Sequence, residues 1–257
     1  MTDDRLPDSA AFATLGTQFG EITRRLAASD GQVDPKLVVS LASAVVPHAH
    51  HCGITVLHRN GAPESVAVTD ELPARVDSLQ YSLHEGPCLD ASEGDDLVVC
   101  DDLDDDARWP AFGPACVAKV GVRSMLSVRV LLVGTDRAAL NFYSTTASAF
   151  DDLDAGVASI FAPFAAMAVN QVVREREVND LGAALGNSRQ IGTAIGVLMA
   201  RYKVTSERAF ELLSEASQHL NRKLRDVAAD VELTGELPAV AGAGRPPAQR
   251  ALEPEPE

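Results

Sequence analysis

Hydrophobic positions in the first part of the chain change period several times, which is typical of alternating helices and strands. Apolar residues recur every three or four positions in residues 15–28 and again in 34–46, so both segments predict helices. Apolar and polar residues instead alternate in 52–58 and 65–69, on either side of the turn sequence Arg59-Asn60-Gly61. The alternation around a turn predicts a β-hairpin.

Three more strands and two short helices follow from the same pattern. The predicted strands cover residues 97–100, 123–132 and 137–143, and the predicted helices cover 72–79 and 109–119. Five or six strands in antiparallel order, with helices before, between and after them, predict an α+β fold in which helices flank an antiparallel sheet.

From residue 151 to residue 202 nearly every position favours helix, which predicts a long connecting helix. Its apolar stripe would present one seam to a partner helix and predicts a homodimer; the stripe comprises Val157, Phe161, Phe164, Ala168, Gln171, Glu175 and Val178. The alternative, that Phe161 and Phe164 pack the helix onto its own domain, stays open. Glycines in a helix interior are unfavourable by up to about 1 kcal/mol each, and those near Gly186-Asn187 predict a kink or break.

Three amphipathic segments near the C-terminal end predict a small three-helix bundle. The first covers residues 189–202, the second is opened by Thr205 as N-cap, and the third begins after Asn221 and ends at Gly235. The inward face predicted for the second helix consists of Ala209, Phe210, Leu213 and Ala216. Short amphipathic helices of this kind bury their apolar faces against one another, so the segment is a separate all-α module.

The charge of the chain is negative overall but positive in this module. Lys and Arg total 22 against 37 Asp and Glu, a net charge of −15, which disfavours general binding to nucleic acid or acidic membranes. Residues 1–180 carry 13 Lys and Arg against 27 Asp and Glu, a balance of −14, whereas residues 185–225 carry 7 against 3, a balance of +4. An anionic partner would therefore be bound at the module.

Arg222, Lys223 and Arg225 gather in the first turn of the third predicted helix. Cations at a helix N-terminus oppose the helix dipole by up to about 1 kcal/mol each, so three of them there favour an anionic partner. A solvated basic patch, paired with Glu215 and Asp226, is the alternative.

The chain shows no targeting pattern, and we expect a cytoplasmic protein. Its N-terminus is acidic, and its longest nearly apolar run, residues 155–169, is shorter than the ~20 residues that span a bilayer, so no transmembrane helix is expected. Residues 1–14 are predicted to be a flexible N-terminus, and the Pro, Gly and Ala-rich residues 238–257 a disordered tail.

Two sets of chemically reactive residues have the side chains that a metal or redox site needs. His48, His50, His51 and Cys52 are metal-ligand types, but neighbouring residues in a strand point to opposite faces, so no metal site is predicted. The four cysteines, Cys52, Cys88, Cys100 and Cys116, include no Cys-x-x-Cys pair, and reduced buried thiols are the expected state.

Four blocks of the first part, EGPCLDA (residues 85–91), DDLDDDARWPAF (101–112), GVRSMLSVRV (121–130) and ALNFYSTTASAFDDLD (139–154), together resemble GAF domains of bacterial cytoplasmic regulators. The resemblance covers residues 15–175, including the connecting helix from residue 151. It implies a sensor domain with a small-molecule ligand, and leaves that ligand or cofactor unknown because GAF domains share a fold more than a ligand.

The module is similar to the ANTAR domain, the RNA-binding module of transcription antitermination regulators, over Ser188 to Ala228, within a domain expected at 181–237. The resemblance implies a dimer that binds stem-loops in nascent transcripts. The RNA-binding residues expected from it are Arg189, Arg201, Tyr202, Ser217, Arg222, Lys223 and Arg225. Ile195 stands where the family usually has lysine, which removes one cation from that face.

The sequence thus predicts a non-enzymatic regulator that promotes antitermination by binding RNA stem-loops under the control of a GAF-like sensor domain. One alternative is a ligand or redox sensor, or a protein-interaction module, without RNA binding. Another is a GAF-type methionine sulfoxide reductase, because three of the cysteines, Cys88, Cys100 and Cys116, lie close together in that part of the sequence.

Overall fold

A computed structural model describes residues 16–17, 20–21, 24, 32–59 and 62–238 of the chain. It divides into two compact units, the first ending at Arg174 and the second beginning at Glu175, and each unit is described by itself. The predicted flexible N-terminus, most of the helix predicted at 15–28, and the predicted tail from residue 239 lie outside the described residues.

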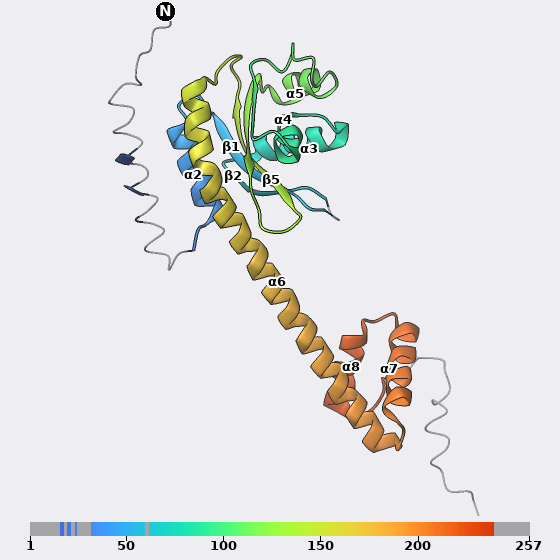
Figure 1. The fold of residues 1–257 in the computed structure, drawn as a ribbon. Coiled ribbons are helices and arrows are strands. Elements are labelled where there is room, and N and C mark those ends of the chain that lie inside the picture. Colours follow the sequence, from blue (N-terminus) through green and yellow to red (C-terminus); the bar gives the residue numbers. More distant parts are fainter. Residues whose placement is uncertain (1–15, 18–19, 22–23, 25–31, 60–61, 239–257) are drawn as a thin grey trace, which may run out of the picture. The chain divides into compact units, whose positions relative to one another are not determined.

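The first unit is built on a five-stranded antiparallel sheet with the order β2-β1-β5-β4-β3 (Figure 1). Its strands are β1 (His51–Leu57), β2 (Glu64–Val68), β3 (Leu97–Cys100), β4 (Ser124–Val130) and β5 (Arg137–Ser144). β1 and β2 form the predicted hairpin, and the predicted α+β class is confirmed. The central strand β5 pairs with both β1 and β4, which places Asn141 opposite Gly53 on one side and Ser127 on the other.

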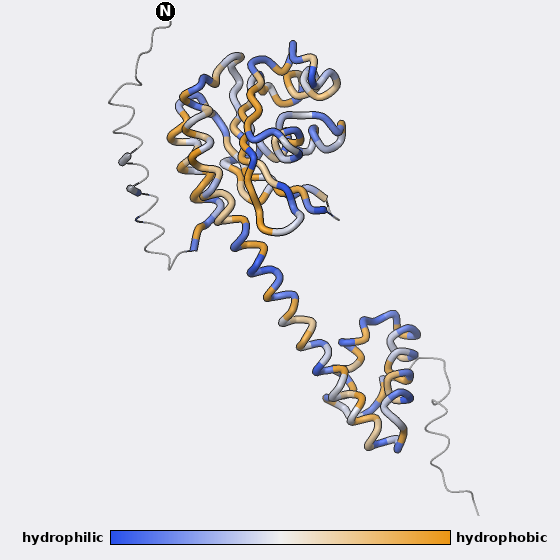
Figure 2. The backbone as a smooth tube through the Cα atoms, viewed as in Figure 1, coloured by the Kyte–Doolittle hydropathy of each residue, from blue (hydrophilic) through white to orange (hydrophobic). Residues whose placement is uncertain are grey.

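One face of the sheet is covered by α2 (Pro35–Val45) and by the first part of α6 (Asp152–Tyr202), as Figure 1 shows. Alternate residues of β5, including Leu140 and Phe142, point into this layer because successive side chains of a strand face opposite sides. Asp34 caps α2 by accepting from the backbone N–H of Lys36 at 2.9 Å. Hydrophobic residues follow the strands and the covering part of α6 (Figure 2).

The opposite face is covered by α3 (Glu71–Leu83), α4 (Pro87–Glu93) and α5 (Phe112–Val120). Trp109, Phe112 and Tyr143 are the largest side chains buried in this layer. The predicted helices at 72–79 and 109–119 correspond to α3 and α5, whereas α4 was not predicted as a helix. Its seven residues are too few for a helical period to stand out from the sequence.

The acidic segment before α5 holds the scaffold together. Asp102 forms an ion pair with Arg123, and Asp106 forms one with Arg108 at 2.6 Å. The guanidinium of Arg108 lies over the Trp109 ring, 4.2 Å from its centroid. Asp102 and Asp106 are therefore structural residues of the domain.

α6 begins at a pair of carboxylates, because Asp151 and Asp154 each accept a hydrogen bond from the backbone N–H of the other. Its packing face in the first unit includes Phe161 and Ala168, which are fully buried in the sheet's core. Val157 is buried in the same core and Phe164 packs against it. The alternative of packing onto the helix's own domain therefore holds for the first four residues of the predicted seam. The exposed apolar positions here are Leu153, Ile160 and Met167, on a different stripe.

The predicted kink or break near Gly186-Asn187 does not interrupt the helix, since α6 extends from Asp152 to Tyr202. None of the described glycines with positive φ lies in this helix. The lower helix propensity of glycine costs about 1 kcal/mol at each site, which is too small to interrupt the helix. Among the described residues this one helix is long and apolar enough to cross a membrane by length and composition. We assign its apolar content in the first unit to packing on the sheet.

The second unit is a helical module formed by the end of α6, α7 (Ser206–Leu220) and α8 (Leu224–Thr234). Thr205 caps α7 as predicted, accepting from the Arg208 backbone N–H at 3.3 Å. The module's core contains Ala194, Leu198, Tyr202, Ala209, Leu213, Ala216, Val227, Ala228 and Val231. Phe210 was predicted to face inward but is 46% exposed, and Leu212 is buried in its place.

Candidate ligand site and nucleic-acid interface

A buried carboxyl group lies between α3 and the sheet in the first unit. Asp77 is 2% exposed. Its Oδ2 accepts hydrogen bonds from Thr55 Oγ1 at 2.5 Å and Ser65 Oγ at 2.8 Å. Its Oδ1 accepts from Tyr143 Oη at 3.0 Å and from Gln80 Nε2 at 3.5 Å. Burial raises the pKa of the Asp77 carboxyl, and the three hydroxyl donors oppose that shift. The carboxyl is therefore held by neutral donors.

Asn141 extends this network of buried polar contacts. Its Nδ2 donates to Thr55 Oγ1 at 3.4 Å and contacts Cys88 Sγ at 3.2 Å. Asn141 Oδ1, Ser127 Oγ and Tyr81 Oη are buried without a hydrogen-bond partner among the described residues. We call this group the Asp77 cluster: Thr55, Ser65, Asp77, Tyr81, Cys88, Ser127, Asn141 and Tyr143. Buried polar atoms are nearly always partnered in folded proteins, so three orphaned atoms mark the cluster as a candidate ligand site.

The EGPCLDA motif places α4 against this cluster. Gly86 has φ +143°, a conformation open to glycine, and a Cβ there would lie 2.2 Å from Gln80 Oε1. That oxygen instead accepts from the Cys88 backbone N–H at 2.9 Å. Glu85 reaches the start of α5, where its Oε2 accepts from the backbone N–H of Phe112 at 3.0 Å. The motif therefore holds α4 beside the Asp77 cluster and contacts the start of α5.

The cysteines are buried free thiols on both faces of the sheet. Burial raises the pKa of the Cys88, Cys100 and Cys52 thiols, and it raises the pKa of Cys116 to about 12. The thiolate is the reactive form of cysteine. These thiols are therefore both enclosed and protonated at neutral pH, which does not support sulfoxide-reducing chemistry.

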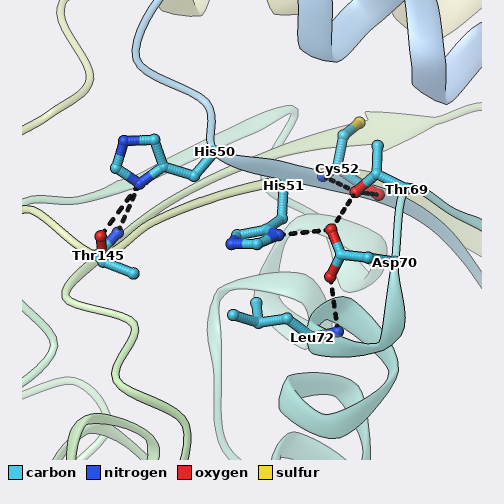
Figure 3. Close-up of polar contacts among 7 residues, drawn as sticks. All are labelled: His50, His51, Cys52, Thr69, Asp70, Leu72 and Thr145. Carbon is cyan, nitrogen blue, oxygen red and sulfur yellow. Dashed lines mark hydrogen bonds and ion pairs between the residues drawn. The ribbon is translucent and has the colours of Figure 1, made fainter.

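The histidine-rich segment before β1 sends its side chains to different partners (Figure 3). His50 Nδ1 accepts from the backbone N–H of Thr145 at 3.2 Å, whereas His51 Nδ1 lies 2.6 Å from Asp70 Oδ2. Cys52 is buried on the α2 face. Their side chains do not converge.

His48 lies apart from them and contacts Asp154 Oδ2 through its Nδ1 at 2.8 Å. This hydrogen bond raises the pKa of His48. Within the part of the chain that the structure describes, no three His, Cys, Asp or Glu side chains are placed to share a metal ion.

An open groove of about 760 Å³ lies beside α3, on the side that faces α5. Arg75 of α3 bridges to α5 by donating to the Lys119 carbonyl at 2.8 Å. The groove's rim carries acidic and basic side chains together, including Asp70 and Lys119. None of the orphaned buried atoms belongs to the residues that line it, so the Asp77 cluster is the better candidate.

In the second unit, several arginines form ion pairs with neighbouring acids. The pairs are Arg201 with Glu236, Arg208 with Glu211 at 2.7 Å and Glu215 at 3.3 Å, Arg222 with Asp230 at 2.5 Å, and Arg225 with Asp226 at 3.5 Å. All of these guanidinium groups are partly exposed. They remain within reach of a phosphate, because an exposed ion pair contributes only about 0–1 kcal/mol.

Two protein-family models match the chain. A family model described as the GAF domain matches residues 36–170, which is more than half of the chain. The chain belongs to the GAF domain family. A second model, the ANTAR domain, matches residues 179–231. GAF domains are sensors and ANTAR domains are RNA-binding antitermination modules, so the chain joins a sensor domain to a regulatory domain.

Solved structures resemble the GAF domain only distantly. The GAF domain of a phosphoenolpyruvate-protein phosphotransferase from Coxiella burnetii is 15% identical over 66% of this chain and 99% of that one, with a TM-score of 0.49. A free methionine-R-sulfoxide reductase from Neisseria meningitidis is 17% identical over 66% of this chain and 96% of that one, with a TM-score of 0.47. No curated protein matches the chain. Likeness at this level does not bear on function.

The ANTAR domain places the expected RNA-binding residues in four kinds of position. Arg201, Arg222 and Arg225 are in the ion pairs given above. Arg189 and Lys223 are exposed, and neither has an ion-pair partner among the described residues. Ser217 Oγ donates to the Arg222 carbonyl at 2.6 Å, which closes the turn before α8. Tyr202 is only 8% exposed in the domain's core, so in this conformation its ring is unavailable to a base.

Phe210 is the residue that the sequence pattern missed. It is a large aromatic side chain exposed on α7 of an RNA-binding domain, where an aromatic ring can stack on an unpaired loop base. The sequence did contain a signal for this exposure. Ala209 and Leu213 lie four positions apart and already form the inward stripe of α7, so Phe210 falls outside it.

Proposed function

We propose that this protein is a ligand-responsive antitermination regulator whose ANTAR domain binds stem-loops in nascent transcripts. The observation that carries the proposal is the ANTAR match over residues 179–231, in the segment where a chain of charge −15 turns basic. Stem-loop binding would stabilise a hairpin that competes with the terminator, so RNA polymerase reads through. This action needs no catalytic residue, and the enclosed thiols supply none.

The proposed interface consists of the exposed cations and Phe210. Lys223 and Arg189 offer their charges to phosphates, and Arg222 and Arg225 lie beside Lys223 at the start of α8. Phosphate contacts from lysine and arginine supply most of the affinity for RNA, whereas exposed loop bases stack on aromatic rings. Phe210 takes the stacking role expected of Tyr202, whose ring is buried.

We also propose that the protein acts as a homodimer through α6. In the second unit Val178, Leu181 and Leu185 follow heptad spacing and are 68%, 63% and 64% exposed. Exposed apolar side chains in such a row are covered when a second copy of the same helix packs alongside. Two ANTAR domains held together would bind two-loop RNA at a high effective concentration that one domain lacks.

The direct test measures binding of the full chain to a two-loop RNA on filters at several salt concentrations. Wild-type affinity is expected to fall steeply between about 50 and 200 mM salt, and Lys223→Ala is expected to weaken binding and reduce the salt slope by about one. Lys119→Ala, an exposed lysine of the GAF domain, is the control with the same loss of charge. Equal binding by both variants would remove Lys223 from the interface.

The runner-up function is a sensor or protein-interaction module without RNA binding. Two observations favour it: Ile195 replaces the family's cation, and Arg201, Arg208, Arg222 and Arg225 are paired with acids of the same domain. In that case the wild-type protein would bind stem-loop RNA no better than a single-stranded RNA of equal length. A terminator read-through assay with purified polymerase separates the two functions, because only the first raises read-through.

A further inference from the structure

The Asp77 cluster contains a buried carboxyl group that no basic side chain of the described chain neutralises. The buried carboxyl of Asp77 is held by hydroxyl groups of Thr55, Ser65 and Tyr143. No lysine, arginine or histidine of the described chain forms an ion pair with it. A buried carboxylate without a cation is unfavourable, and burial accordingly raises the pKa of Asp77. A cation bound beside it would stabilise the ionised form of this carboxyl group.

The orientation of the Asn141 amide shows what else is missing. Thr55 has one hydroxyl proton and donates it to Asp77 at 2.5 Å, so its oxygen must accept from Asn141. The amide nitrogen therefore faces Thr55 at 3.4 Å and Oδ1 faces the other way, buried and unpartnered. An orphaned acceptor is satisfied only by a donor.

Ser127 adds a second orphaned oxygen beside the first. The β4–β5 register places Ser127 directly opposite Asn141, so both side chains lie on the same face of the sheet. Ser127, Asn141 and Asp77 are at most 2% exposed. Tyr81 lies one helical turn after Asp77 on α3, with its hydroxyl also buried and unpartnered. A ligand enclosed by such residues must be small.

We propose that the Asp77 cluster is the sensor site of the GAF domain and that its ligand is a small cation bearing N–H donors, an ammonium ion or a small primary alkylammonium. Its charge would be balanced by the Asp77 carboxylate, and its N–H groups would be accepted by Asn141 Oδ1 and Ser127 Oγ. The same charge argument excludes carboxylate and phosphate ligands. The inference rests on the proposed role of this domain as the sensor.

The test compares ammonium chloride and methylammonium chloride with potassium chloride at equal ionic strength, on the full chain without RNA. Potassium is similar in size to ammonium but has no N–H group, so it separates donor recognition from charge alone. At a hundredfold excess over its Kd, a ligand shifts the folding equilibrium about a hundredfold toward the native state. A higher Tm in the ammonium salts than in potassium chloride is expected, together with heat of binding by calorimetry.

Two variants and one control assign the effect to the cluster. Asp77→Asn keeps the shape, removes the charge and is expected to abolish the ammonium-dependent rise in Tm. Ser127→Ala removes an unpartnered hydroxyl, so it is expected to fold as well as wild type while binding ammonium more weakly. Asp154→Asn removes another buried carboxylate, the one that pairs with His48 on the α2 and α6 side of the unit, and is expected to respond like wild type.

Each remaining outcome overturns the proposal in a defined way. An equal response to potassium overturns N–H recognition, and a response to sodium formate overturns the charge argument. If none of the probes gives a response, the proposed ligand class is wrong. A water molecule that satisfied the orphaned atoms would give that result. RNA binding on filters is scored separately: if it holds while ammonium fails, the proposed function stands without this ligand, and if it fails while ammonium binds, the site stands without the RNA function.

Discussion

At the scale of single residues, the ANTAR domain separates side chains that look alike in the sequence. Ile195 and Phe210 are both apolar residues on amphipathic helices, but Ile195 packs against the domain's core while Phe210 is 46% exposed. The exposure of each side chain depends on where it lies relative to the inward stripe of its helix. A residue next to that stripe in sequence points about 100° away from it around the helix axis, toward solvent.

Ile195→Lys restores the family's cation at a half-buried position, so we expect lower stability with no gain in RNA affinity. Losing about half of the burial of an isoleucine side chain removes roughly 1 kcal/mol. Urea unfolding and filter binding measure the two effects. Thr193→Lys, which adds the same charge at an exposed site on the same helix, is the control and should keep wild-type stability. Tighter RNA binding by Ile195→Lys than by the control would contradict this placement.

His58 gives the GAF domain a pH-dependent contact. Its Nδ1 lies 2.7 Å from Asp136 Oδ2 and its Nε2 lies 3.3 Å from Glu64 Oε2. The hydrogen bond with Asp136 raises the pKa of His58, although burial opposes the shift. A raised pKa means that folding favours the protonated form, so this stabilisation is complete below about pH 6.5. It is lost as the pH rises through the folded-state pKa.

We therefore expect His58→Gln to destabilise the protein by up to about 1 kcal/mol at pH 6, and by clearly less at pH 8.5. Urea unfolding at both pH values, with wild type measured in parallel, gives the difference and cancels the contribution of His48. The same loss at both pH values would show that His58 acts by packing rather than by charge.

At the scale of elements, α6 carries two apolar stripes with different purposes. Phe161 and Ala168 are buried on the sheet, while Leu153, Ile160 and Met167 are exposed at intervals of one heptad. The predicted seam instead joined residues of the buried stripe to the exposed Val178 and left out the stripe of Leu153, Ile160 and Met167, because an α-helix with apolar residues on two faces satisfies several spacings at once. Only the position of the sheet shows which face the domain itself covers.

Val178→Asp is expected to dissociate the proposed dimer, since a carboxylate in an apolar helix seam is left without a partner. Light scattering at micromolar concentration should give the mass of a dimer for wild type and of a monomer for the variant. Two-loop RNA binding should weaken much more than single-loop binding. Ala183→Asp places the same charge on the opposite side of the helix, at an exposed position, and should remain dimeric. A monomeric wild-type protein would exclude this route.

At the scale of the whole molecule, the chain joins a GAF sensor domain to an ANTAR regulatory domain. Charge divides along the same line, with an acidic first part and a basic segment at 185–225. In the proposed function, this division would let an acidic protein bind RNA through its basic segment, because charges farther away than about 10 Å are screened at ordinary salt.

The sequence by itself determined the α+β class, the β1–β2 hairpin, the Thr205 cap and both family assignments. These are local properties: alternation, capping residues and short motifs are readable within a few neighbouring positions. The tertiary structure alone decided that Tyr202 is buried, that α6 is unbroken, and that Asp77 lies under the sheet. The contact between Asn141 and Thr55 spans 86 positions of the chain. No periodicity or spacing could reveal it, because it exists only once β1 and β5 are paired and α3 has packed across them.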